Sequence, residues 1–146
     1  MTKKFITFTL LLIFYSNTIF AESSRYFNFD KGIVPLIYHR FGEPKYPSTN
    51  IQMEVFKKQI DKINESNYNY FNLNDFENFF KKPSLEKKIL ITIDDAFTSF
   101  YENAWPYLKE NKIPFILFVS TEPMGKYGYM NWDQIREIEK EDFVLI

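Results

Sequence analysis

The stretch Lys88–Ser120, which reads KILITIDDAFTSFYENAWPYLKENKIPFILFVS, decides the fold. It begins with an apolar run, Ile89–Ile93, whose β-branched residues favour a strand. A helical pattern follows from about Ser99 to Asn111, and a second apolar run occupies Phe115–Val119. Strand, helix and strand in this spacing predict a βαβ unit with parallel strands.

Two carboxylates come directly after the first strand of this unit. Asp94 and Asp95 are therefore expected at the carboxyl edge of a parallel sheet, where α/β proteins build their sites. The same pair also suits a structural role, because Asp side chains form Asx turns and cap helices. The two acids alone leave both interpretations open.

Composition limits the class of protein. The chain has 146 residues, of which 45% are hydrophobic, and this suffices for one packed domain. The formal net charge is -1 and no basic cluster occurs, so no nucleic-acid partner is expected. Cysteine is absent, which excludes disulfides and thiolate chemistry. The single histidine is His39.

Residues 1–21 have the pattern of a signal peptide. Lys3 and Lys4 form a positive start, and the apolar stretch Phe5–Tyr15 is shorter than the ~20 residues that span a membrane. Ala21 is a small residue suited to cleavage. We therefore expect an exported protein, in the periplasm, at the cell surface or outside the cell. Membrane insertion is expected only if the segment stays uncleaved.

A strand and a helix are predicted before the βαβ unit. The strand Ile33–Tyr38 ends at His39. Pro35 within it cannot donate a ladder hydrogen bond, so we expect that the strand lies at an edge of the sheet or begins near Pro35. Helical spacing then begins near Gln52 and ends at about Asn64. The predicted apolar face of this helix comprises Met53, Phe56, Ile60 and Ile63.

Shorter sequence patterns predict the remaining helices and strands of the first two thirds of the chain. Tyr68–Leu73 reads as a strand, and Asn74 is a candidate N-cap of a short helix that reaches Phe80. Pro106 lies inside the helical stretch of the βαβ unit, so a kink or restart is expected there.

The last part of the chain predicts one more helix and strand. Asn131 is expected to cap a helix that buries Trp132, Ile135 and Ile138. The apolar run Phe143–Ile146 reads as the start of another buried strand. Alternating strands and helices over this length give about half of a (β/α) barrel of ~200 or more residues. We therefore expect a fragment, or a gene cut short.

The sequence TIDDAF at Thr92–Phe97 resembles the first motif of polysaccharide deacetylases, the NodB-homology proteins of carbohydrate esterase family 4, which usually reads T-F-D-D-G. The resemblance extends over Val34–Arg40, Tyr101–Lys109, Ile113–Phe115, Phe118-Val119 and Met130–Gln134. It implies an α/β fold, a partial (β/α) barrel of the NodB type truncated at its C-terminus. The domain would occupy residues 22–146 as the N-terminal, incomplete part of such a domain.

The resemblance also implies roles for three residues. Asp94 would be the general base that takes a proton from the attacking water, and Asp95 would be a ligand to a divalent metal, zinc or a similar ion. His39 would line the cleft and contact the substrate. A histidine at a strand end is also an ordinary surface or capping residue.

Two departures from the family pattern stand out. Ala96 replaces the usual glycine, which puts a Cβ where the turn can need a positive φ. The family's other metal ligands are two histidines in an H-S/T-x-x-x-H motif, placed after a strand that resembles Phe143–Ile146. This sequence stops at Ile146 and its only histidine is His39, so weak zinc binding is expected.

The predicted function is metal-dependent hydrolysis of N-acetyl groups on an amino-sugar polysaccharide. A non-catalytic exported protein that binds carbohydrate or acts as a scaffold is the alternative from another class. A sugar hydrolase using Asp94 and Asp95 as paired acids is disfavoured, because adjacent residues cannot easily flank a glycosidic bond at the ~5 to 9 Å that such mechanisms need.

Overall fold

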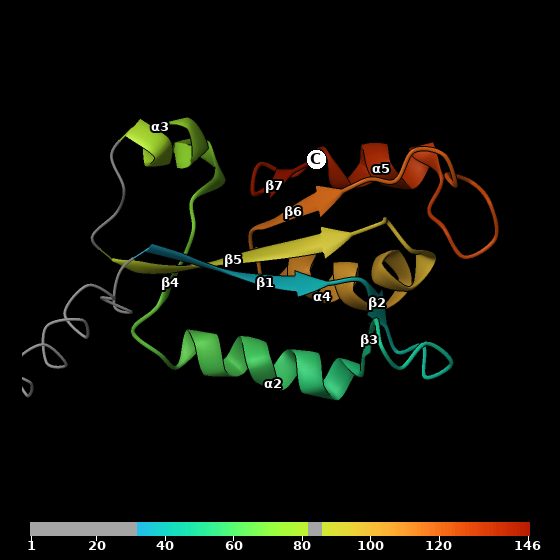
Figure 1. The fold of residues 1–146 in the computed structure, drawn as a ribbon, viewed down its shortest axis with the longest axis horizontal. Coiled ribbons are helices and arrows are strands. Elements are labelled where there is room, and N and C mark those ends of the chain that lie inside the picture. Colours follow the sequence, from blue (N-terminus) through green and yellow to red (C-terminus); the bar gives the residue numbers. More distant parts are fainter. Residues whose placement is uncertain (1–31, 82–85) are drawn as a thin grey trace, which may run out of the picture. The chain divides into compact units, whose positions relative to one another are not determined.

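A parallel sheet forms the centre of the computed structural model, which describes residues 32–81 and 86–146 (Figure 1). The strand order is β1 (Gly32–Tyr38), β5 (Lys87–Asp94), β6 (Phe115–Phe118) and β7 (Val144–Leu145), and β4 (Asn69–Tyr70) also pairs with β5. Every pairing in this sheet is parallel. The two apolar runs of the βαβ unit are parallel neighbours, as predicted, and β1 pairs with the first of them in the same sheet.

The register aligns the ends of the central strands. Ile37 is paired with Thr92 in β1 and β5, and Asp94 is paired with Phe118 in β5 and β6. Among the described strands, β1 pairs with β5 alone, so Pro35 lies on an edge strand where its missing N–H breaks no ladder. The edge prediction is confirmed.

Helices, turns and two short strands connect the strands of the sheet. They are β2 (Arg40–Phe41), β3 (Asn50–Ile51), α2 (Met53–Asn64), a 3₁₀ turn (Leu73–Asp75), α3 (Phe76–Lys81), a π-helical turn (Phe100–Ala104), α4 (Trp105–Glu110) and α5 (Trp132–Ile138). The break predicted at Pro106 is confirmed, because this residue lies within the first two positions of α4. Proline has no N–H to continue the preceding α-helical ladder, so the chain makes a π-helical turn and restarts.

One face of the sheet carries the core. Ile91, Ile93 and Phe115 are fully buried on this face, together with Leu117. The helices contribute Phe56, Ile60, Ile63, Phe100, Ala104, Leu108, Ile135 and Ile138 to the same cluster. Burying a large apolar side chain contributes about 1.5–3 kcal/mol, so this face fixes how the helices pack on the sheet.

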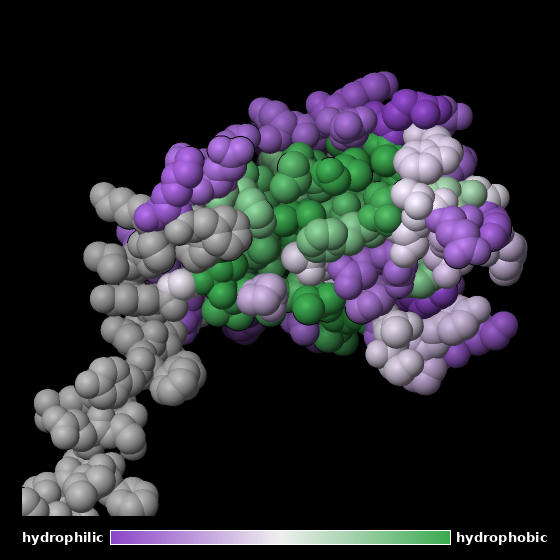
Figure 2. Space-filling view, turned by 45° about the horizontal axis from the view of Figure 1, so that its top comes forward, coloured by the Kyte–Doolittle hydropathy of each residue, from purple (hydrophilic) through white to green (hydrophobic). Residues whose placement is uncertain are grey.

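The other face of the sheet is largely open. Ile37 is 60% exposed and Phe118 is 54% exposed, although Thr92 between them is 7% exposed. Figure 2 shows hydrophobic residues gathered over one broad surface with hydrophilic residues around it. Alternate residues of a strand point to opposite faces, so Thr92 and Asp94 share this open face.

Two local predictions near α3 need correction. The strand expected over Tyr68–Leu73 is limited to Asn69–Tyr70. The expected cap at Asn74 is wrong, because the Asn72 side chain accepts the hydrogen bond from the Asn74 backbone N–H and opens the 3₁₀ turn instead. Two asparagines two residues apart both suit an Asx turn, and the earlier one forms it.

Helix α5 begins where it was predicted, but it does not bury its first residue. Asn131 and Gln134 form a capping box, and Ile135 and Ile138 are buried. Trp132 is 47% exposed, so its predicted burial is wrong. Met130 is fully buried just before the cap and, with Ile135, occupies the positions of a hydrophobic staple.

The final strand is confirmed in part. Val144–Leu145 forms β7, which pairs with β6 as a parallel strand. Its burial is incomplete, since Leu145 is 41% exposed and Ile146 is 43% exposed. The predicted signal peptide at residues 1–21 lies outside the described residues. Within the part of the chain that the structure describes, no helix is both long and apolar enough to cross a membrane.

We expect Asn131→Ala to lower the free energy of unfolding by about 1 kcal/mol, because the substitution removes a side-chain cap from α5. Asn74→Ala is the matched control, since the cap near α3 comes from Asn72. Urea unfolding followed by circular dichroism measures both. Equal losses in the two variants would show that the capping box of α5 contributes nothing specific.

Candidate active site

The carboxyl ends of three adjacent strands bring polar side chains to one edge of the sheet. His39 follows β1, Asp94 is the last residue of β5 and Asp95 follows it. Ser120 comes two residues after the end of β6. His39 and Asp95 therefore lie at the same edge of the sheet, because β1 and β5 run parallel and in register.

His39 and Asp94 lie close together. The distance from His39 Nε2 to Asp94 Oδ2 is 3.7 Å, and the two side chains are 32% and 35% exposed. This separation permits attraction between an imidazolium and the carboxylate, although it is longer than a normal hydrogen bond. Both groups remain open to solvent and to a ligand.

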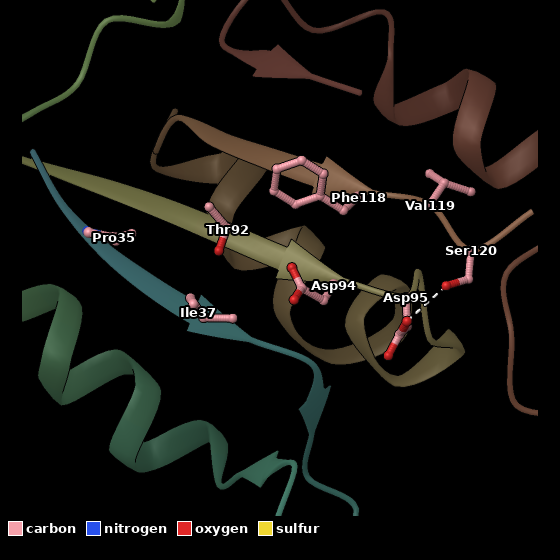
Figure 3. Close-up of a pocket in the computed structure, with 8 residues that line it drawn as sticks. All are labelled: Pro35, Ile37, Thr92, Asp94, Asp95, Phe118, Val119 and Ser120. Carbon is pink, nitrogen blue, oxygen red and sulfur yellow. Dashed lines mark hydrogen bonds between the residues drawn. The ribbon is translucent and has the colours of Figure 1, made fainter.

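Asp95 is oriented by its backbone and by a serine. Its φ is 70°, so the chain turns sharply directly after β5. The Ser120 hydroxyl donates a hydrogen bond of 2.8 Å to Asp95 Oδ1 (Figure 3). Sequence reasoning did not single out Ser120. Its position directly after an apolar strand, at the same edge as the acids, is the signal that could have identified it.

Ala96 occupies the turn in which the related motif has glycine. Its φ is 54° and its side chain is fully buried. The turn therefore does require a positive φ, and Ala96 adopts it despite its Cβ. A left-handed conformation costs an L-residue roughly 1–2 kcal/mol, which the burial of Ala96 and the hydrogen bond from Met130 N–H to its carbonyl oppose.

A cleft of about 420 Å³ opens over the acids on the exposed side of the sheet. It is lined by Pro35, Ile37, Thr92, Asp94, Asp95, Phe118, Val119 and Ser120 (Figure 3). Asp94 and Thr92 come from the same strand and point to the same side, as Figure 3 shows. The cleft thus combines apolar walls with two carboxylates and two hydroxyls at one end.

Arg40 contacts residues of two loops, Tyr46 after β2 and Phe97 after β5. Its guanidinium carbon lies 4.0 Å from the centroid of the Tyr46 ring and 3.5 Å from that of Phe97. Its Nη1 also donates to Glu43 Oε2 at 2.9 Å. Since Arg40 directly follows His39, these contacts of Arg40 help to hold the histidine beside Asp94.

The described residues do not make a complete metal site. A catalytic zinc ion takes three protein ligands. Among residues 32–81 and 86–146, no three His, Cys, Asp or Glu side chains are grouped so that they could hold an ion. Asp95 offers one carboxylate, and its Oδ1 already accepts the hydrogen bond from Ser120.

The fold and the site define a class, an α/β domain of the NodB type whose first acidic motif ends a central parallel strand. Residues 81–146 match the polysaccharide deacetylase family. A poly-β-1,6-N-acetyl-D-glucosamine N-deacetylase of Staphylococcus aureus is 28% identical over 107 residues, which cover 73% of this chain and 37% of that protein. The chain therefore spans about a third of the length of this curated relative.

Solved structures agree with these matches. The structure of IcaB from Ammonifex degensii superposes with a TM-score of 0.69 at 29% identity, and the match covers 79% of this chain and 51% of that one. A Streptococcus pyogenes deacetylase, PplD, shares the fold with a TM-score of 0.65 at 19% identity over 80% of this chain and 55% of its own. By family model, by sequence and by fold, the chain is similar to polysaccharide deacetylases.

We expect Arg40→Lys to lower the free energy of unfolding by about 1–2 kcal/mol, because lysine cannot stack a planar group between two rings and each such contact is worth about 0.5–1 kcal/mol. Lys62→Met is the control, since it removes an exposed ion pair with Glu65 and should change stability too little to measure. Chemical unfolding compares the two variants. No loss in Arg40→Lys would mean that the stacking is not required.

We also expect the chain to bind zinc weakly, because Asp95 is one carboxylate and further ligands do not surround it among the described residues. Isothermal titration calorimetry of the chain with zinc chloride measures this, with Asp95→Asn as the matched variant. Tight one-to-one binding that Asp95→Asn abolishes would contradict the expectation.

Proposed function

We propose that this protein hydrolyses N-acetyl groups of an amino-sugar polysaccharide and releases acetate. The observation that supports this most directly is the convergence of His39, Asp94 and Asp95 at one sheet edge, with 3.7 Å between His39 Nε2 and Asp94 Oδ2. The match of residues 81–146 to the polysaccharide deacetylase family supports the same chemistry. The poly-β-1,6-N-acetyl-D-glucosamine named in the Staphylococcus aureus relative suggests a polymer of this type as substrate.

Asp94 is proposed as the general base. Its carboxylate lines the cleft and is 35% exposed, so a water molecule can reach it. Proton transfer to Asp94 lets the water oxygen attack the amide carbonyl carbon. When the C–N bond breaks, the proton taken by Asp94 passes to the leaving nitrogen, which gives acetate and the free amine. His39 is proposed to contact the substrate while it keeps the Asp94 carboxylate in position.

Asp95 is proposed as one ligand of a divalent metal, zinc by family resemblance. Carboxylate oxygens are ordinary zinc ligands, and the hydrogen bond from Ser120 to Oδ1 leaves Oδ2 available. The described residues do not complete such a site. The assignment therefore concerns Asp95 alone, as one contributor to a site that needs further ligands.

Export is part of the same proposal. The pattern of residues 1–21 supports a signal peptide followed by a deacetylase domain from residue 22 onward. An exported enzyme would meet a polysaccharide in the periplasm, at the cell surface or outside the cell. Antibody detection of the protein in cell fractions, with mass spectrometry of its N-terminus, tests both the location and the cleavage.

We expect Asp94→Asn to reduce acetate release by ~100- to 10,000-fold while bound metal stays nearly constant, because asparagine keeps the shape but cannot accept the proton. Asp95→Asn should instead lower metal content, and its activity should partly recover in excess metal. Asp133→Asn is the matched control, since Asp133 lies on α5 with a side chain that is 88% exposed. Acetate release and bound metal are measured for all three variants, made in a protein completed with the further metal ligands that the family resemblance implies.

The same assays distinguish the alternatives. Loss of metal in Asp94→Asn and retention in Asp95→Asn would reverse the two assignments. A wild-type protein that binds the polymer but releases no acetate under any metal condition would favour the non-catalytic carbohydrate-binding protein.

A further inference from the structure

The parallel ladder between β1 and β5 ends just before His39 and Asp94. Its last partners are Tyr38 and Ile93, so the His39–Asp94 pair lies one residue beyond the ladder on both strands. Both side chains of the pair are partly exposed, so close packing alone does not fix the imidazole. The position of His39 therefore depends on what holds the backbone that follows β1.

Phe41 is the anchor of that backbone. The N–H groups of its two neighbours, Arg40 and Gly42, donate to carbonyls of residues 49–51. Successive peptide groups of an extended chain point to opposite sides, so the N–H and carbonyl of Phe41 point away from β3. Phe41 is fully buried, and buried backbone groups need hydrogen-bond partners.

Two side chains of the segment after β5 supply these partners. The Ser99 hydroxyl accepts a hydrogen bond of 3.3 Å from the Phe41 N–H, and the Asn103 side-chain amide donates one of 2.7 Å to the Phe41 carbonyl. Residues four apart in a helical segment lie on the same face, so Ser99 and Asn103 both reach Phe41. Together they take the place that a neighbouring strand would occupy beside β2.

The π-helical turn places Asn103 at the surface. The Trp105 N–H donates to the Phe100 carbonyl five residues earlier, and turns of this kind are frequent at functional sites. Asn103 is exposed, whereas the next residue, Ala104, is fully buried. Substituting Asn103 therefore removes its hydrogen bond and leaves the packing of the core intact.

We propose that Asn103 is a positioning residue of the site, which holds the Phe41 carbonyl and thereby keeps His39 beside Asp94. The hydrogen bond joins the two segments that present the pair, since Phe41 follows His39 in the chain and Asn103 follows Asp94. The effect on turnover rests on the proposed function. The effect on the position of His39 does not, because that position can be measured without a substrate.

Nuclear magnetic resonance of the chain, made without a histidine tag, tests this position at one fixed pH. His39 is the only histidine, so its ring-proton signals identify themselves. Asp94→Asn removes the carboxylate 3.7 Å from His39 Nε2 and should shift these signals. In the Asn103→Ala background this shift should fall to about half or less, because two groups couple only while they stay in contact.

Asn111→Ala is the matched control, because the Asn111 side-chain amide also donates to a backbone carbonyl, that of Tyr107, at 2.8 Å. This bond lies at the end of α4 and does not involve β2. In the Asn111→Ala background, Asp94→Asn should shift the His39 signals as much as in the wild type.

Hydrogen exchange gives a second readout on the same samples. The Phe41 amide should exchange roughly 10-fold faster in Asn103→Ala, because a buried carbonyl without its partner lets this segment open more often. The amides of β5 should keep their wild-type rates, which shows that the fold is intact. An undiminished His39 shift together with unchanged Phe41 exchange in Asn103→Ala would overturn the inference.

Turnover is measured in the same completed protein as for the Asp94 and Asp95 variants. Asn103→Ala should lower kcat/KM for acetate release by roughly 10- to 100-fold, since a small displacement of a group at the reacting centre costs rate. Added to His39→Ala, it should cause no further loss, and additive losses would overturn the positioning role. Wild-type protein that releases no acetate would overturn the proposed function alone, while a reduced His39 shift still supports the role of Asn103.

Discussion

The parallel pairing of β5 with β1 on one side and β6 on the other is the constraint on which the site depends. Parallel strands that are in register end at the same edge, so His39 and Asp94 meet although 54 residues lie between them in the sequence. The pairing itself is fixed by burial, because Ile91 and Ile93 must face the helices. A one-residue slip of β5 would turn these side chains outward and carry Asp94 to the core face.

Most of the sheet could be predicted because its signals are local. Short apolar runs rich in β-branched and aromatic residues, such as Ile89–Ile93 and Phe115–Val119, favour buried strands, and Pro35 restricts its own strand to an edge. The position of the two acids could be predicted in the same way, since a residue directly after a parallel strand lies at the carboxyl edge. Their convergence with His39 needed only the assumption that the strands run parallel.

The features that escaped prediction depend on neighbours distant in sequence or on competition between similar residues. Arg40 is stacked on Phe97, which lies in another loop, and no local sequence pattern predicts that contact. Asn72 and Asn74 are equally good caps in isolation, and the path of the chain selects Asn72. Trp132 has the spacing of the buried face of α5, but Met130 fills the position that covers the start of the helix.

The open face of the sheet connects the fold to the site. In a closed (β/α) barrel the face opposite the helices lines the interior, and its residues near the carboxyl end border the active site. Thr92 and Asp94 lie on this face, beside the exposed Ile37 and Phe118. The chain covers 51% of the solved IcaB chain that it resembles, so that structure contains further residues with no counterpart in this match. The apolar part of the face favours contact with other protein, whereas the carboxylates at its end favour contact with water and substrate. Along the open face of β5 the side chains change from Leu90 through Thr92 to Asp94. This change from apolar to acidic separates the part that stabilises the fold from the part that can do chemistry.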